Sequence, residues 1–397
     1  MKDSQPKQRW LLLSSSTGTG HNMRANSLAL WARNVFGEDQ IEISTSQALE
    51  STHRIYGFGV GLYNFIQRKA PWLHHVYFNY LEIAGMHRKA SRIMGTERFK
   101  QVVRATRPDR VISVHAHTNH GYFELVRSAA EEAGFAPPAC ITYCGELFAG
   151  YGFSRHWSNA AADGFIGATS EVCAAARAIG LPGKRTYPGG FLLRPHFYLP
   201  AITLRERAIT VGRQLDLDPE AFTLFVSTGL AGANNHPAIV HALGRSGPEP
   251  LQVIMACGQR EDTQRKLTHI ARQYPHLSVR PLGPIDPARM ASLKTLASVV
   301  VARPGTGTTS EAIQLGVPLI HNRIGGIMPQ ELITAQYCKH HHCTLQARSP
   351  EDVATKVRRL QSAPDECATL RTNLLSARPK GTPEDIVRWI ARCQVAS

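Results

Sequence analysis

Residues 303–311 read Arg303-Pro304-Gly305-Thr306-Gly307-Thr308-Thr309-Ser310-Glu311. An apolar run over residues 297–302 precedes this segment, and residues 312–320 continue as a helical pattern followed by a second apolar run. The proline and the two glycines prevent a helix from starting early, whereas the hydroxyl side chains after them suit the first turn of one. The segment therefore predicts a strand, a loop and a helix whose N-terminal N–H groups bind an anion.

The carboxylate that ends this loop, Glu311, needs a different role because it does not favour an anion. We expect it to accept hydrogen bonds from the hydroxyls of a sugar, and a phosphate beside a ribose indicates a nucleotide. A second flexible loop follows over residues 325–331, where Gln330 and Glu331 offer an amide and a carboxylate to sugar hydroxyls. The alternative is a glycine-rich turn that caps its own helix and binds nothing.

Another glycine loop lies near the N-terminus, where Gly18, Gly20 and His21 follow an apolar run and precede an amphipathic segment that ends near Phe36. This order again predicts a strand, a loop and a helix. In Rossmann-like folds such a loop lets the backbone approach a diphosphate. A dinucleotide-binding fingerprint does not fit, because no third glycine follows the first two.

Together these segments resemble the GT-B nucleotide-sugar glycosyltransferases, in particular the family of monogalactosyldiacylglycerol synthases and processive diacylglycerol glucosyltransferases. The resemblance spans nearly the whole chain. It implies an α/β protein of two Rossmann-like domains that face each other across a cleft. It also implies a UDP-hexose donor as co-substrate, no further cofactor, and a diacylglycerol acceptor.

The family carries a Gly-x-Gly-His motif at the cleft, and Gly18, Gly20 and His21 match it. The resemblance implies that His21 is the general base of an inverting transfer, taking the proton from the acceptor hydroxyl as that oxygen attacks the anomeric carbon. The other interpretation is that His21 only forms a hydrogen bond with its own loop at a helix N-terminus.

The donor site that the resemblance implies is spread over both glycine loops and the C-terminal half. Gly229 and Gly232 would lie near the diphosphate, and residues 282–285 resemble the loop that receives the uracil edge. The family's asparagine near Gln330 is Thr334 here, so glucose and galactose both remain open. The predicted donor-binding residues are Gly18, Gly20, Gly229, Gly232, Gly283, Ile285, Arg303, Gly305, Thr306, Gly307, Thr308, Thr309, Glu311, Gln330 and Glu331.

The chain departs from the family most clearly between residues 142 and 157. Trp157 keeps the family spacing, but Ser154 stands where relatives have a histidine, and Glu146, in a longer loop, replaces their aspartate. Glu146 is therefore a second candidate catalytic residue, either as the base or as the group that orients it. Equally, it could be an ordinary acid of a surface loop.

Length and composition agree with two domains, because 397 residues with 43% apolar content can form two full-sized cores. A break at residues 189–197 matches the family's hinge segment. The alternation of apolar runs with helical patterns indicates parallel sheets on both sides of this break. We expect an N-terminal domain for acceptor and membrane over 1–195, a donor domain over 196–378, and a C-terminal helix within 379–397 that crosses back.

A net charge of +15 requires an anionic partner, which could be nucleic acid, a nucleotide or an acidic membrane surface. The segment from His53 to Arg104 contains nine basic residues and only two acidic ones, and many aromatic side chains lie among them. This mixture favours a membrane surface. The alternatives are stacking on single-stranded nucleic acid and an ordinary helix pair with a solvated basic face.

The resemblance also favours the membrane, because family members dock on anionic lipid through basic and apolar segments at this place. We therefore expect no nucleic acid. His115 matches a family histidine that lines the cleft. The residues predicted to contact the acceptor or the membrane are His115, Tyr63, Phe65, Arg68, Lys69 and Trp72.

No run of eighteen apolar residues and no signal-peptide core is present, so we expect a peripheral protein at the cytoplasmic face of the cell membrane. Histidines at 115–120 and 340–342 have spacings that could recruit a metal. We predict no metal site, because a strand followed by a loop does not make such ligands converge.

The predicted function is inverting transfer of galactose or glucose from a UDP-sugar to the hydroxyl of 1,2-diacylglycerol. Two enzymatic alternatives are a transferase for another lipid-linked acceptor and a UDP-sugar epimerase, which shares the fold and needs no membrane face.

Overall fold

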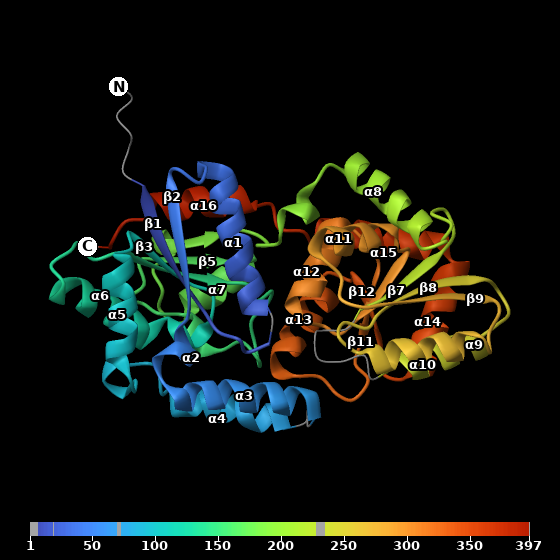
Figure 1. The fold of residues 1–397 in the computed structure, drawn as a ribbon, viewed down its shortest axis with the longest axis horizontal. Helices are drawn as coiled ribbons and strands as arrows, with labels where there is room; N and C mark the ends of the chain where they lie inside the picture. The colour runs from blue at the N-terminus through green and yellow to red at the C-terminus, as the bar shows by residue number, and fades with distance from the viewer. Residues whose placement is uncertain (1–6, 19, 70–72, 228–234, 397) are drawn as a thin grey trace. The chain divides into compact units, whose positions relative to one another are not determined.

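The computed structural model describes residues 7–18, 20–69, 73–227 and 235–396 (Figure 1). The chain forms two compact units. Unit 1 comprises residues 1–193 and 379–397, and unit 2 comprises residues 194–378. Both are α/β units built on a six-stranded parallel sheet.

Unit 1 has the strand order β2-β1-β3-β4-β5-β6, so the order reverses between β1 and β3. Its central strands are apolar on both faces, as a parallel sheet covered by helices on both sides requires. The strands are β1 (Gln8–Ser14), β2 (Ile41–Gln47), β3 (Arg110–Ser113), β4 (Ala139–Cys144), β5 (Gly164–Gly167) and β6 (Thr186–Pro188). The helices are α1 (Gly20–Phe36), α2 (Ala48–Thr52), α3 (Arg54–Lys69), α4 (His74–Ala84), α5 (Thr96–Thr106), α6 (His120–Glu132), α7 (Ser170–Ala178) and α16 (Pro383–Arg392).

The C-terminal helix α16 belongs to unit 1, where it packs beside α1 (Figure 1). Thr382 and Asp385 form a capping box that starts this helix. Trp389 stacks on Tyr187, with ring centroids 5.6 Å apart, and also covers Gly164, where any side chain would collide with the indole. Residues more than 180 positions apart in sequence therefore share one core.

Unit 2 has the strand order β12-β11-β10-β7-β8-β9, which reverses between β7 and β10. Its strands are β7 (Thr223–Val226), β8 (Leu251–Ala256), β9 (Leu277–Leu282), β10 (Val299–Ala302), β11 (Leu319–Asn322) and β12 (Thr344–Ala347). Its helices are α8 (Ala201–Gln214), α9 (His236–Arg245), α10 (Glu261–Ala271), α11 (Pro287–Leu296), α12 (Thr306–Leu315), α13 (Pro329–His340), α14 (Pro350–Ser362) and α15 (Pro364–Ser376).

In open parallel sheets, ligands bind outside the carboxyl ends of the strands at the point where the strand order reverses. In unit 1 this point lies at the loops after β1 and β3, and in unit 2 at the loops after β7 and β10. The two glycine loops that the sequence singles out follow β1 and β10.

Candidate active site

His21 is the second residue of α1, directly after the glycine loop that follows β1. Its Nδ1 atom lies 2.7 Å from the carbonyl oxygen of Val114, the residue that follows the neighbouring strand β3. Because a carbonyl can only accept, Nδ1 carries the proton and Nε2 is the basic nitrogen. The fold thus fixes both the tautomer and the direction of the imidazole ring.

The surroundings of His21 favour its neutral form. Burial lowers the pKa of His21 to about 3, and the positive charge of Arg24 acts in the same direction, whereas the hydrogen bond to Val114 opposes both. The ring lies edge-on to His115, with centroids 4.4 Å apart, and within 6.2 Å of Trp157. At neutral pH the imidazole is therefore unprotonated at Nε2 and able to accept a proton. Its low pKa makes it a weak base.

The glycine loop itself is held by side chains from the loop after β3 and from α3. His115 Nε2 lies 2.9 Å from the Thr17 hydroxyl, and His115 Nδ1 accepts the backbone N–H of His117. Asn64 of α3 accepts the Gly18 N–H at 2.9 Å and donates to the Ser16 carbonyl. Gly18 has a φ of +67°, a conformation that favours glycine. Asn64 was not predicted, because an asparagine on an amphipathic helix is usually solvated.

Six histidines of unit 1 gather behind this loop, and we call them the histidine cluster: His21, His87, His115, His117, His120 and His156. Ring centroids are 5.7 Å apart between His115 and His117, and 4.8 Å apart between His117 and His156. Mutual repulsion adds to burial, which lowers the pKa of His87 and of His120 to about 4. Within the part of the chain that the structure describes, no group of three or more potential ligands is arranged to hold a metal ion.

Glu146, the second candidate catalytic residue, is buried on the loop after β4. Arg24 of α1 donates to the carbonyl oxygen of Gly145 at 3.1 Å, which ties this loop to the helix that carries His21. The guanidinium lies so close that a side chain at position 145 would collide with it. Glu146 is therefore not an acid of an exposed surface loop.

In unit 2, the segment from Arg303 to Glu311 forms the loop and helix that the sequence predicts. The helix α12 begins at Thr306 after Gly305, and its first-turn N–H groups are directed at the space beyond the helix N-terminus, where an anion could accept from them. Thr309 is fully buried, and its hydroxyl lies 3.2 Å from His321 Nε2. Its side chain thus packs inside unit 2.

Arg303 connects the two loops of the predicted donor site. Its guanidinium pairs with both carboxylate oxygens of Glu331, with Nε 2.9 Å from Oε1, and also donates to the carbonyl oxygens of Ile324 and Gly326. Glu331 in turn accepts the N–H of Met328 and so caps α13. Arg303 and Glu331 therefore hold residues 324–331 in place, and neighbouring Gln330 is the more exposed of the predicted sugar ligands.

Glu311 is buried in unit 2 and is paired with cations. Lys294 of α11 donates to its Oε2 atom, and Arg194 Nη2 lies 3.9 Å from Oε1. Thr306, at the start of α12, and Thr334, in the middle of α13, have hydroxyl oxygens 3.3 Å apart. Gly283 and Ile285 follow β9 and are partly exposed. The structure confirms a helix after β10 but starts it at Thr306, so Glu311 lies inside α12 and not at the end of the loop as predicted. It also adds a lysine that the sequence did not reveal.

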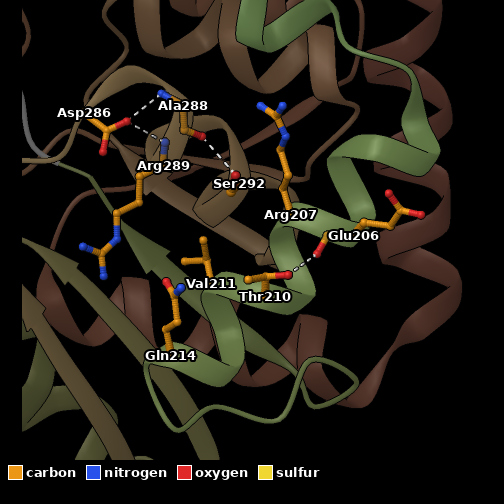
Figure 2. A pocket seen from close by; sticks show the side chains of 9 residues that line it. All are labelled: Glu206, Arg207, Thr210, Val211, Gln214, Asp286, Ala288, Arg289 and Ser292. Atoms are coloured by element: carbon orange, nitrogen blue, oxygen red, sulfur yellow. Dashed lines mark hydrogen bonds between the residues drawn. The ribbon is translucent and has the colours of Figure 1, made fainter.

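Several predicted residues lie outside the described part of the chain: Gly229, Gly232 and Trp72, together with the side chains of Arg68 and Lys69. A shallow hollow of about 400 Å³ lies between α8 and the N-terminus of α11, and Figure 2 shows its lining residues. Asp286, Ser292 and Thr210 make hydrogen bonds to their own helices there. None of the predicted site residues lines this hollow.

Helices α3 and α4 pack side by side at one edge of unit 1 (Figure 1). Both helices carry exposed apolar side chains. Phe58 is 72% exposed and Ile83 is 82% exposed. Tyr63 instead packs against His74 and Tyr77 between the helices, whereas Phe65 faces solvent. We call the exposed set the apolar edge; it comprises Ile55, Phe58, Leu62, Phe65, Val76, Tyr80 and Ile83.

No described helix has both the length and the apolar character needed to span a bilayer.

The sequence is similar to curated enzymes over most of its length. It is 23% identical over 361 residues to a probable monogalactosyldiacylglycerol synthase of Glycine max, covering 89% of this chain and 65% of the relative. It is 25% identical over 230 residues to the processive diacylglycerol beta-glucosyltransferase of Staphylococcus saprophyticus, covering 57% of this chain and 56% of the relative. The match thus spans less than two thirds of either relative. No protein-family model matches the chain.

Solved structures share the architecture at low sequence identity. MurG of Acinetobacter baumannii matches with a TM-score of 0.58 at 14% identity, covering 98% of this chain and all of MurG. The UDP-GlcNAc 2-epimerase of Neisseria meningitidis matches with 0.59 at 11% identity, covering 96% and 98%. HepE of Anabaena, in complex with UDP-glucose, matches with 0.53 at 14% identity, covering 96% and 98%. The chain has the GT-B fold, and its curated homologues are monogalactosyldiacylglycerol synthases and processive diacylglycerol glucosyltransferases.

Proposed function

We propose that the protein is an inverting glycosyltransferase that moves galactose or glucose from a UDP-hexose to the hydroxyl of 1,2-diacylglycerol at the cytoplasmic face of an anionic membrane. The observation that carries the proposal is His21, whose neutral imidazole is held at the strand-order reversal of unit 1 with Nε2 as the basic nitrogen. The names of the curated homologues support diacylglycerol as acceptor.

The reaction needs one base and one stabilised leaving group. Nε2 of His21 takes the proton of the acceptor hydroxyl, while that oxygen attacks the anomeric carbon from the face opposite to UDP. The departing diphosphate gains negative charge, which the N–H groups at the start of α12 stabilise. Glu311 accepts hydrogen bonds from the ribose, and Gln330 contacts the hexose. His21 is the only proton acceptor that this reaction needs.

The test is incubation of the purified protein with diacylglycerol in anionic vesicles and either UDP-galactose or UDP-glucose, with the lipid product identified by mass. We expect a hexosyl-diacylglycerol of β configuration from an α-linked donor, with one donor preferred. Glu311→Ala should abolish the product, because it removes the ribose acceptor. Binding of UDP without any glycolipid would keep the donor site and contradict diacylglycerol as acceptor.

A UDP-sugar epimerase is the second candidate, because the Neisseria meningitidis epimerase shares the fold. An epimerase acts on a soluble substrate and does not need the apolar edge. Conversion of a UDP-sugar to its epimer in the absence of lipid, detected by chromatography of the nucleotide fraction, would support this candidate against the transferase.

The apolar edge is the part of unit 1 that we assign to the membrane. Inserting an exposed Phe or Ile side chain into lipid contributes about 1.5–3 kcal/mol to membrane binding. The double variant Phe58→Ser/Ile83→Ser should therefore bind anionic vesicles more weakly by a factor of about ten or more. Vesicle sedimentation measures this directly. The control is Ile202→Ser on α8, because Ile202 is 68% exposed but belongs to unit 2. An equal loss in the control would contradict docking through α3 and α4.

A further inference from the structure

Lys294 is a buried lysine in the last turn of α11, with a side chain that is only 1% exposed. A buried ammonium group is costly unless an opposite charge compensates it. Here the compensation comes from Glu311 of α12, whose side chain is 6% exposed and whose Oε2 atom accepts from Lys294 Nζ. Helices α11 and α12 are thus joined by an ion pair, and α12 is the helix that follows the predicted nucleotide loop.

The pair engages the two carboxylate oxygens of Glu311 unequally. Lys294 takes Oε2, whereas Arg194 Nη2 is 3.9 Å from Oε1, which is an ionic contact and too long for a hydrogen bond. Each carboxylate oxygen can accept about two hydrogen bonds, so Oε1 keeps its capacity to accept from a ligand. Lys294 therefore fixes the orientation of the Glu311 carboxylate through Oε2 and does not occupy Oε1.

We propose that Lys294 is a positioning residue for nucleotide recognition, which holds Glu311 so that Oε1 accepts hydrogen bonds from the ribose hydroxyls. The inference rests on the proposed function, because it takes Glu311 as the ribose ligand. Lys294 would act only through Glu311 and would not touch the nucleotide. Its removal should leave the diphosphate contacts at the start of α12 intact.

Two nucleotides separate this role from a purely structural one: UDP and 2′,3′-dideoxy-UDP, which differ only in the ribose hydroxyls. A hydrogen bond to a charged group should make the wild-type protein prefer UDP by about ten- to hundredfold in calorimetric titration. In Lys294→Met, the preference should largely disappear while the affinity for dideoxy-UDP stays close to that of the wild type. A structural role would instead weaken both nucleotides equally.

The matched control is Lys356→Met, which removes a lysine paired with Asp352 near the surface of α14 in the same unit. It should leave the UDP preference unchanged. If Lys294→Met does not fold, Lys294→Arg is used to test the positioning role instead. Arginine keeps the positive charge but places its donor atoms elsewhere. A reduced preference in the arginine variant supports the proposal.

If Lys294→Met keeps the wild-type preference for UDP over dideoxy-UDP, the positioning role is overturned and the proposed function stays intact. The same holds for Lys294→Arg where the methionine variant does not fold. A wild-type protein that binds both nucleotides equally removes Glu311 as ribose ligand and overturns the inference. A wild-type protein that binds neither nucleotide contradicts the inference together with the proposed function.

Discussion

Replacing His21 with alanine is expected to lower the rate of hexosyl transfer by about 10²–10⁴-fold, the usual contribution of a general base. The hydrogen bond from Nδ1 to Val114 holds the ring in place, and alanine removes the basic nitrogen Nε2 altogether. UDP binding should persist, because α12 and Glu311 belong to unit 2. Initial rates at saturating donor, together with UDP titration, measure both quantities.

The pH dependence of the wild-type rate adds a second test of the same residue. With a pKa of about 3, His21 stays neutral throughout the neutral range, so its protonation should not limit the rate until the pH approaches that value. Measurements must stay at pH values where unit 1 is folded. A rate that falls with a midpoint near the ordinary histidine pKa of about 6.5 would contradict the burial-lowered pKa of His21.

The control for the alanine variant is His269→Ala, since His269 is an exposed histidine on α10 of unit 2. It should transfer hexose at the wild-type rate. Glu146→Gln tests the competing assignment, because the glutamine keeps the size of the side chain and removes its charge. A nearly inactive Glu146→Gln beside an active His21→Ala would identify Glu146 as the base.

The loops of the candidate site could be predicted because their signals are local. The helix α12 begins at Thr306, a few residues earlier than the hydroxyl side chains had indicated. Even so, residues 297–302 read as an apolar strand, and the order of strand, glycine loop and helix followed from a few adjacent residues. The same holds for His21 after Gly18 and Gly20. Propensity and strand alternation act over such short distances, and parallel sheets repeat them in every βα unit.

The partners of these residues could not be predicted because they come from distant segments. Lys294 lies 17 positions before Glu311, on a different helix. From the sequence it would be taken for a solvated lysine, and only the packing of α11 against α12 shows that it is buried. Arg303 offers a comparable case: it was predicted only as a donor-binding residue, and its pairing with Glu331, 28 positions further along the chain, had no signal in the sequence. Charge alone does not tell which partner a side chain will meet after folding.

The histidine cluster was only partly visible in the sequence, as the spacing of His115, His117 and His120. His21, His87 and His156 join them from distant segments, and tertiary packing alone brings the six together. Cations lie nearby too, because Arg88 and Arg155 act with burial to lower the pKa of His120. For His156, burial lowers the pKa and Glu82 opposes it.

Acidification to about pH 5 should therefore destabilise unit 1 by several kcal/mol. The folded-state pKa values of His21, His87 and His120, about 3 to 4, lie below the ordinary value of 6.5. Their stabilising contribution is complete above pH 6.5, about the unfolded pKa, and is lost below it, because the unfolded chain then binds protons that the folded state excludes. Each histidine costs about 1.4 kcal/mol per pH unit, so three cost at most about 6 kcal/mol at pH 5.

Tryptophan fluorescence measures this loss selectively, because all five tryptophans of the chain belong to unit 1. Urea unfolding followed at pH 7.5 and pH 5 should give a much lower midpoint at pH 5. His87→Gln and His120→Gln each remove one titrating group, so each should reduce the pH dependence of the unfolding free energy by about 1.4 kcal/mol per pH unit. His269→Gln on α10 should not change it. Equal stability at both pH values would mean that the cluster can bind protons without unfolding, and that the surrounding residues do not hold these histidines neutral.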